Sequence, residues 1–92
     1  NSSGAYQAVF LNNGQGYFGK LSGEDSFSLV LRDVFYVQVT QPPNINLVKL
    51  GSELHGPTDE MKINRSQVLF TENLRPDSPV VRSILEYKKS NP

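Results

Sequence analysis

The sequence predicts a mainly β domain: a small, strongly bent antiparallel sheet or barrel of about five to six strands with one C-terminal α-helix. Three observations support this fold class. The stretch Val9–Val39 is almost continuous β-type sequence that contains a hairpin turn at Asn13-Gly14. Its second part, Phe27–Val39, is more than twice as long as a usual strand of about 5–6 residues. After Ser78, apolar residues recur at helical spacing.

The first element is a hairpin. In Tyr6–Leu11 the residues alternate, and both alternating sets are largely apolar, which indicates a strand enclosed on both faces. Asn13-Gly14 is a strong hairpin signal because both residues tolerate a positive φ. The return strand is predicted over Gly16–Leu21. Its two glycines, Gly16 and Gly19, would weaken a flat strand but permit the sharp coiling of a small barrel.

A polar segment, Ser22–Ser26, predicts a second turn before the long run. Within Phe27–Val39 the odd-numbered residues form an apolar face that only Asp33 interrupts. A strand of this length predicts a bend or bulge near Arg32-Asp33, where one strand passes between two parts of the sheet. The alternative is a tight turn at this point, which would divide the run into two strands.

The remaining β elements are short. Thr40–Asn46 contains Gln41-Pro42-Pro43-Asn44, which cannot continue a central strand and predicts an exposed loop. Further strands are expected at Leu47–Leu50, Met61–Ile63 and Gln67–Thr71. Gly56-Pro57 marks a turn between the first two of them.

The C-terminal element is an amphipathic helix over about residues 79–89. Ser78 is suited to the N-cap, and Pro79 to the first helical position, where its missing N–H has no partner to lose. A stripe of Val81, Ile84 and Leu85 is expected to pack on the sheet or over a barrel mouth. Lys88 and Lys89 fall in the last turn, where they favour the negative end of the helix dipole.

Composition limits the possible classes of protein. The 92 residues suit one small domain, and nine basic residues balance nine acidic ones, so the basic excess typical of nucleic-acid binders is missing. There is no cysteine, which excludes disulfides and thiolate metal sites. We expect residues 1–5 to be a linker or cloning remnant, 6–89 a single domain and 90–92 a tail. Because the sequence begins with Asn1 and not with Met, we also expect a processed product or an excised domain.

Catalytic candidates are few. His55 is the only histidine, and the segment Glu53–Glu60 gathers one imidazole and three carboxylates. A hard-metal or acid–base site formed by Glu53, His55, Asp59 and Glu60 is conceivable. The simpler interpretation is a turn-rich loop with solvated carboxylates, since a lone histidine lacks the partners that catalytic geometry requires. We therefore expect no catalytic residues, no cofactor and no enzyme activity, and we assign a candidate interaction surface to the loop residues Glu53, His55, Pro57, Asp59 and Glu60.

Two other patterns are weaker. Gly14-x-Gly16-x-x-Gly19 matches a dinucleotide-binding pattern by letter only, because it lies within a hairpin rather than between a strand and a helix. The aromatic residues Tyr17, Phe18, Phe35 and Tyr36 could stack on nucleobases. Their strand positions and the neutral charge of the chain favour core and cross-strand packing instead.

One part of the chain resembles the first motif of Sm-like RNA-binding barrels. The resemblance rests on Val9-Phe10-Leu11, Gly14 and Tyr17-Phe18-Gly19-Lys20-Leu21, and it extends through Asp25 to the segment Ser28–Val34. The base-contacting Asn of that family has no match, Ser28 being the nearest residue, and the second motif would be Asn64–Val68. The resemblance implies an SH3-like or Sm-like barrel, with RNA binding as an alternative function.

The whole chain resembles a family of short, uncharacterised bacterial proteins of the candidate-phylum type. The shared segments are Ala8–Leu21, Leu47–Met61, Ile63-Asn64-Arg65 and Val68-Leu69-Phe70. The resemblance implies that one N-terminal transmembrane helix precedes this domain, which would place it outside the cytoplasmic membrane. It implies no activity.

Together these observations predict a non-catalytic interaction or scaffold module, the extracytoplasmic domain of a membrane-anchored bacterial protein. We expect a protein partner or self-association rather than nucleic acid. The alternatives are an Sm-like oligomeric RNA-binding barrel and a metal-binding domain that uses the Glu53–Glu60 loop.

Overall fold

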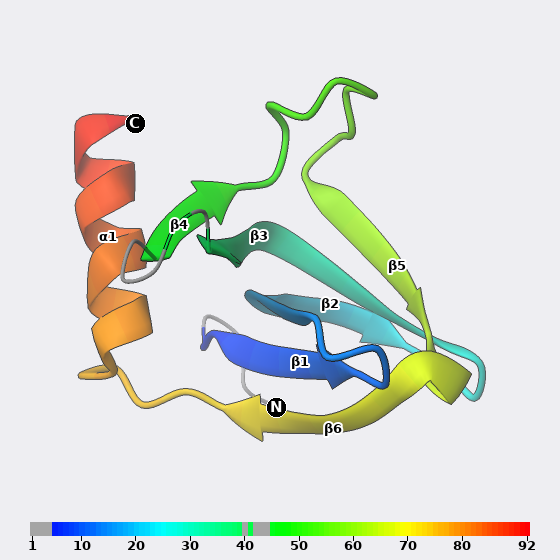
Figure 1. Ribbon diagram of the computed structural model, residues 1–92. Coiled ribbons are helices and arrows are strands. Elements are labelled where there is room, and N and C mark those ends of the chain that lie inside the picture. Colours follow the sequence, from blue (N-terminus) through cyan, green and yellow to red (C-terminus); the bar gives the residue numbers. More distant parts are fainter. Residues whose placement is uncertain (1–4, 40, 42–44) are drawn as a thin grey trace.

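The computed structural model describes residues 5–39, 41 and 45–92, which form a six-stranded antiparallel sheet and one C-terminal helix (Figure 1). The prediction of a mainly β, strongly bent antiparallel sheet with a C-terminal helix is therefore confirmed. The elements are β1 (Gln7–Leu11), β2 (Gly16–Glu24), β3 (Ser28–Val39), β4 (Ile45–Lys49), β5 (Glu60–Asn64), the 3-10 helix η1 (Arg65–Gln67), β6 (Val68–Asn73) and α1 (Pro79–Ser90).

Strand β3 organises the sheet. The strands follow the order β4-β3-β2-β1-β6, and β5 pairs with β3 on the same side as β4. The first half of β3 pairs with β5, from Ser28 opposite Asn64 to Arg32 opposite Glu60. The second half pairs with β4, from Phe35 opposite Lys49 to Val39 opposite Ile45. The sheet of the described residues is open, and one long strand carries both of its arms.

The two arms meet at a bend at Asp33. Among the described residues, Asp33 is the one non-glycine residue with a positive φ, at 57°. This left-handed conformation turns the backbone between the β5-paired and β4-paired segments, while β3 continues as one strand. The predicted bend near Arg32-Asp33 is confirmed, and the alternative of two separate strands is wrong. Aspartate is among the few residues that tolerate this conformation, because its short side chain can hydrogen-bond locally.

Gly19 lies on the neighbouring strand β2, where its missing side chain leaves room for the bend of β3. A Cβ atom added at Gly19 would lie 2.9 Å from the backbone oxygen of Arg32, which is too close for a real contact. We expect Gly19→Ala to lower the free energy of unfolding by about 1–3 kcal/mol, as measured by urea denaturation. Gly23→Ala is the matched control, since nothing lies within 4 Å of its added Cβ. Equal stability of the two variants would contradict this role of Gly19.

The sheet buries apolar side chains on both faces, as the pattern of β1 predicted. One cluster, on the face that α1 covers, contains Tyr6, Ala8, Phe18, Phe35, Val81 and Ile84. The second cluster, on the opposite face, contains Val9, Leu29, Leu31, Val34 and Ile63. The assignment of Phe18 and Phe35 to the core is confirmed. The rings of Tyr17 and Tyr36 pack edge to face across β2 and β3, with their centroids 5.9 Å apart.

Helix α1 follows the predicted start but not the whole predicted stripe. The Ser78 side chain accepts hydrogen bonds from the backbone N–H groups of Val80 and Val81, and Pro79 opens the helix. Val81 and Ile84 are buried against the sheet, whereas Leu85 is 54% exposed, so its predicted packing on the sheet is wrong. Leu85 follows Ile84 by about 100° around the helix, and this rotation carries it to the edge of the contact.

Several predicted boundaries shift. The turn expected at Ser22–Ser26 is present but begins later, because Gly23 and Glu24 still pair with Val30 and Leu29 in β3 and the chain turns over Asp25–Phe27. Strand β4 begins at Ile45, inside the loop that the prolines predicted, and residues 40 and 42–44 of that loop lie outside the described residues. The predicted linker likewise falls there, apart from Ala5. None of the helices among the described residues has the length and apolar composition needed to cross a bilayer.

Candidate functional site

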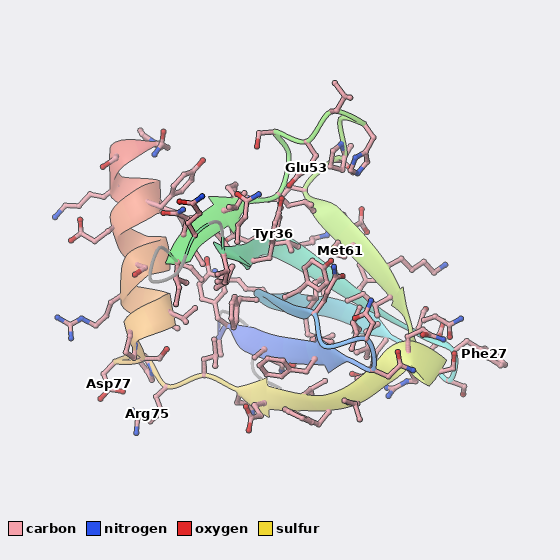
Figure 2. The ribbon with its side chains drawn as sticks, viewed as in Figure 1. Phe27, Tyr36, Glu53, Met61, Arg75 and Asp77 are labelled. Atoms are coloured by element: carbon pink, nitrogen blue, oxygen red, sulfur yellow. The ribbon has the colours of Figure 1, made fainter. Side chains whose placement is uncertain are left out.

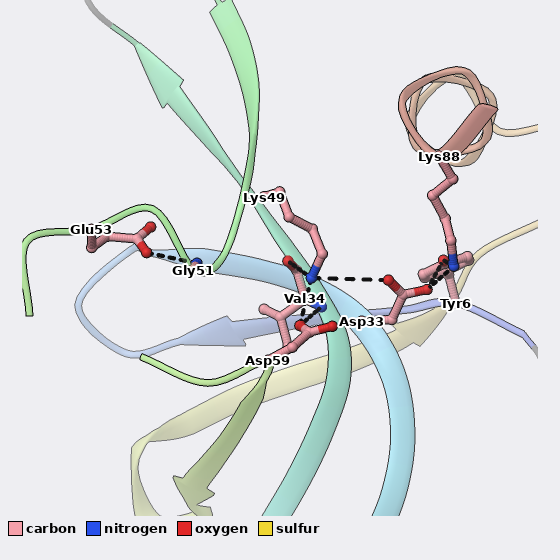
Figure 3. Close-up of polar contacts among 8 residues, drawn as sticks. All are labelled: Tyr6, Asp33, Val34, Lys49, Gly51, Glu53, Asp59 and Lys88. Atoms are coloured by element: carbon pink, nitrogen blue, oxygen red, sulfur yellow. Dashed lines mark hydrogen bonds and ion pairs between the residues drawn. The ribbon is translucent and has the colours of Figure 1, made fainter. Parts of the chain in front are cut away.

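A polar network surrounds the bend of β3 (Figure 3). We call Tyr6, Asp33, Lys49, Asp59 and Lys88 the bend network. The Asp33 side chain is only 17% exposed; its Oδ2 atom accepts a hydrogen bond from the Tyr6 hydroxyl and lies 2.5 Å from Lys88 Nζ. Its Oδ1 atom lies 4.0 Å from Lys49 Nζ. The bend is thus fixed to the start of β1, to β4 and to the last turn of α1.

The second carboxylate of the network satisfies the backbone where the ladder is interrupted. Val34 follows the bend and lies between the β5-paired and β4-paired segments of β3. Its N–H donates to Asp59 Oδ1 at 2.9 Å, and its C=O accepts from the Leu50 N–H at 2.9 Å. Lys49 Nζ lies 2.5 Å from Asp59 Oδ1. Because a buried backbone group without a partner is costly, Asp59 compensates for the ladder bond that the bend removes.

The electrostatics of the bend network favour its ionised, paired state. Burial acts to raise the pKa of Asp33, but hydrogen bonds from Lys88 and Tyr6 and the charges of Lys88 and Lys49 hold it below its usual value. The hydrogen bond to Asp33 raises the pKa of Lys88. Burial and the Asp33 carboxylate raise the pKa of Tyr6 to about 12. Such shifts keep Lys88 and Tyr6 protonated at neutral pH, which is the reverse of activating a nucleophile or a general base.

The loop between β4 and β5 stands out from the body of the domain and is tied down near its start (Figure 2). Glu53 accepts hydrogen bonds from the Tyr36 hydroxyl and, at 2.8 Å, from the Gly51 N–H. The hydrogen bond to Glu53 raises the pKa of Tyr36 to about 12, and the same bond lowers the pKa of Glu53. Asp59 ties the other end of the loop to the bend.

The structure does not bring the predicted metal candidates together. Glu53 binds Tyr36, Asp59 binds Lys49 and Val34, and Glu60 forms an ion pair with Arg32 at 3.6 Å. His55 is exposed on the loop. No group of three or more histidine or carboxylate side chains suited to a metal ion occurs among the described residues. Of the candidate interaction surface, three carboxylates are engaged within the chain, whereas His55 is exposed and Pro57 is half-buried.

The two segments that resemble Sm motifs do meet in space. Asp25 Oδ1 accepts hydrogen bonds from the N–H groups of Phe27 and Ser28, both at 2.8 Å. Arg65 Nε donates to the backbone oxygen of Asp25 at 2.6 Å. At the same turn Phe27 projects into solvent, 80% exposed, at the end of the sheet remote from α1 (Figure 2). The polar groups of Asp25 and Arg65 therefore shape a turn that presents one aromatic ring.

An apolar strip crosses the helix-covered face of the sheet beyond the helix itself. We define it as Phe10, Val37, Val39, Ile45 and Phe70. Phe10 opposes Phe70 across β1 and β6, and Val39 opposes Ile45 across β3 and β4, so each pair shares one face. Phe10 and Leu47 both pack against the cluster that α1 covers. Because Val37 lies opposite Leu47 in the sheet, the Val37 side chain is on this same face.

Four side chains of the strip are exposed to solvent although they are large and apolar. The exposed fractions are 38% for Val37, 57% for Val39, 66% for Ile45 and 49% for Phe70. A groove of about 590 Å³ borders the strip at Phe10, Val37 and Val39. The rings of Tyr17, Phe18 and Tyr36 also line the groove, whereas Ile45 and Phe70 lie outside its lining. Gln15 and Gln38 supply polar groups, and no charged side chain is among the described residues that line the groove.

Gly16 sets the shape of this groove. A Cβ added at Gly16 would lie 2.8 Å from Cε1 of Phe10, so the phenyl ring lies directly across the glycine. The ring also contacts Phe70, with centroids 4.9 Å apart. Sequence reasoning missed the strip because its members come from four strands, and only the strand register places them on one face. The exposed alternation of Val37 and Val39 was the one local signal.

The comparisons with known proteins give no family to which the chain can be assigned. No family model matches the sequence, and no curated protein matches it.

Proposed function

We propose that this domain is a non-catalytic protein-interaction module, which binds an uncharged, apolar segment of a partner protein along the apolar strip. The observation that carries the proposal is the exposed strip with its groove. Exposed apolar residues that occur singly need no explanation, but a contiguous patch around a groove is typical of an interaction site. The bend network supports a binding role, since it holds the sheet rigid and leaves its own groups unsuited to proton transfer.

The strip supplies a large part, but not all, of the binding energy that a micromolar complex needs. Burying an exposed Val or Ile side chain contributes about 1.5–3 kcal/mol, and a micromolar complex needs a net gain of about 8 kcal/mol. Val39, Ile45 and Phe70 together are of this order before the cost of association is subtracted. A partner with two or three aliphatic or aromatic anchors at strand-like or helical spacing fits this surface best, and a charged one would lose solvation in the groove.

A peptide library displayed on phage and selected on the immobilised domain tests this proposal. We expect enrichment of peptides with aliphatic and aromatic anchors, whose affinity falls at least tenfold for Val39→Asp and Ile45→Asp. Both side chains are more than half exposed, so the fold should survive, which circular dichroism checks. Leu54→Asp is the matched control, because Leu54 is a fully exposed leucine outside the strip. Peptides whose binding depends on Leu54 but not on the strip would refute the assignment of the site.

We propose that the module works outside the cytoplasmic membrane, attached to a membrane anchor. The resemblance to the uncharacterised bacterial family is the support for this location. The coding sequence upstream of Asn1 tests it: an apolar segment of about 20 residues agrees with an anchor, and an uninterrupted polar domain contradicts it.

A second candidate function is the binding of single-stranded RNA at the turn that presents Phe27. The observation in its favour is the exposed Phe27 ring beside Arg65, whose backbone N–H donates to Phe27 O at 2.8 Å. An exposed ring of this kind can stack on a base. Salt-sensitive RNA binding that is lost in Phe27→Ala would favour this candidate. Absence of any RNA complex at low salt would remove it.

A further inference from the structure

A second hollow lies between α1 and the segment that leads into β1. Its volume is about 310 Å³, the lower end of the range of about 300–1,000 Å³ for small-molecule sites. Its walls are mainly apolar and include Leu74, Pro76, Val81 and Leu85. Leu85, the helix residue that fails to pack on the sheet, borders this hollow instead.

Two lysines, Lys20 and Lys88, line the same hollow. Lys88 lies 2.5 Å from Asp33 and is partly neutralised by it. Within the described part of the chain, Lys20 has no carboxylate partner; its ammonium lies 5.0 Å from the centroid of the Tyr6 ring. Lys49 and Lys88 pair with the two carboxylates of the bend, Asp33 and Asp59, so Lys20 is the cation of this hollow whose charge no carboxylate neutralises among the described residues.

We propose that this hollow binds a medium-chain monocarboxylate, of the fatty-acid type, with its carboxylate at Lys20 and its chain against the apolar wall. An unpaired cation beside an apolar cavity matches an amphiphile with one negative head group. The third N–H of Lys88 can add a second hydrogen bond, since an ammonium has three donors and the contacts to Asp33 and Tyr6 use two. The small volume selects for a single short chain over a two-chain lipid.

Titration of the folded domain with decanoate below its micellar concentration, followed by calorimetry, tests this site. We expect saturable one-to-one binding that weakens at least tenfold in Lys20→Met, which keeps the apolar stem but removes the charge. Lys62→Met is the control that removes a lysine elsewhere. We expect Leu85→Glu to abolish binding, because it places a carboxylate at the apolar wall. Decanol lacks the charge, so the wild type should bind it at least tenfold more weakly than decanoate. The affinity for decanol should be the same in the wild type and in Lys20→Met.

Three results would overturn the proposal. The first is no saturable binding of decanoate to the folded wild-type domain. The second is equal affinity of decanoate for the wild type and for Lys20→Met, with both proteins shown to be folded by circular dichroism. The third is binding of decyltrimethylammonium as tightly as decanoate, which would show an apolar hollow without preference for an anion. Each result is independent of whether the apolar strip binds a peptide.

Discussion

Replacing Phe35 with alanine is expected to lower the free energy of unfolding by about 3–5 kcal/mol, the largest effect of any single substitution considered for this domain. Phe35 is completely buried, it belongs to the cluster beneath α1, and its ring packs edge to face on Tyr87 with centroids 5.4 Å apart. Truncation removes the transfer energy of the ring and leaves a cavity between the sheet and the helix. A small domain with a total stability of about 5–15 kcal/mol would be severely weakened.

Urea unfolding monitored by circular dichroism measures this effect. Phe27→Ala is the matched control, because it removes the same side chain from a position that is 80% exposed. We expect the control to keep nearly the stability of the wild type. Similar losses in the two variants would contradict the assignment of Phe35 to the core and of Phe27 to the surface.

Replacing Asp33 with alanine is expected to have the second largest effect, about 3 kcal/mol. Roughly 2 kcal/mol follows from loss of the network, because the nearly buried Tyr6 hydroxyl loses its acceptor and Lys88 loses its counter-ion in a partly exposed setting. About 1 kcal/mol more follows from alanine in the left-handed conformation at φ 57°. Asp77→Ala is the control, since the Arg75–Asp77 pair is more than three-quarters exposed (Figure 2) and should contribute nothing measurable.

Asp33→Asn separates the charge from the backbone conformation. Asparagine tolerates the left-handed region and can still accept the Tyr6 hydrogen bond, so we expect a loss smaller than that of alanine by about 1 kcal/mol. Because the folded-state pKa of Asp33 lies below its ordinary value of 3.8, its charge stabilises the fold above that value and ceases to do so as the pH falls through the lowered pKa. The stabilities of the wild type and Asp33→Asn should therefore converge as the pH falls below about 4. A constant difference between pH 7 and pH 3 would contradict the ion-pair account.

The elements that local chemistry determines could be predicted from the sequence. The two-sided apolar pattern of Tyr6–Leu11 gave a strand with a core on each face, and Ser78-Pro79 gave the start of α1. The break at Asp33 in an otherwise apolar alternation located the bend of β3. In each case a residue and its near neighbours carry the signal, so no knowledge of the tertiary arrangement was needed.

The bend network and the apolar strip could not be predicted, because both depend on contacts between distant parts of the chain. Asp33 meets Tyr6 and Lys88 across 27 and 55 positions of the sequence. Lys88 has an ordinary role at a helix C-terminus, which concealed its second role as a counter-ion. The strip follows from the register of four strand pairs, of which sequence patterns specify only the hairpin between β1 and β2. The acidic loop misled in the other direction, since Glu53, Asp59 and Glu60 are neighbours in sequence but bind three different partners.

The most direct test of the proposed function is a map of backbone amide shifts in the NMR spectrum of the domain when a selected peptide is added. The proposal predicts the largest changes at Gly16, Val37, Val39 and Ile45, which lie along the groove and at its edge. Changes confined to residues 51–59 would assign binding to the loop between β4 and β5, and changes confined to the turn around Phe27 would assign it to that turn. Either result would contradict the apolar strip as the docking surface.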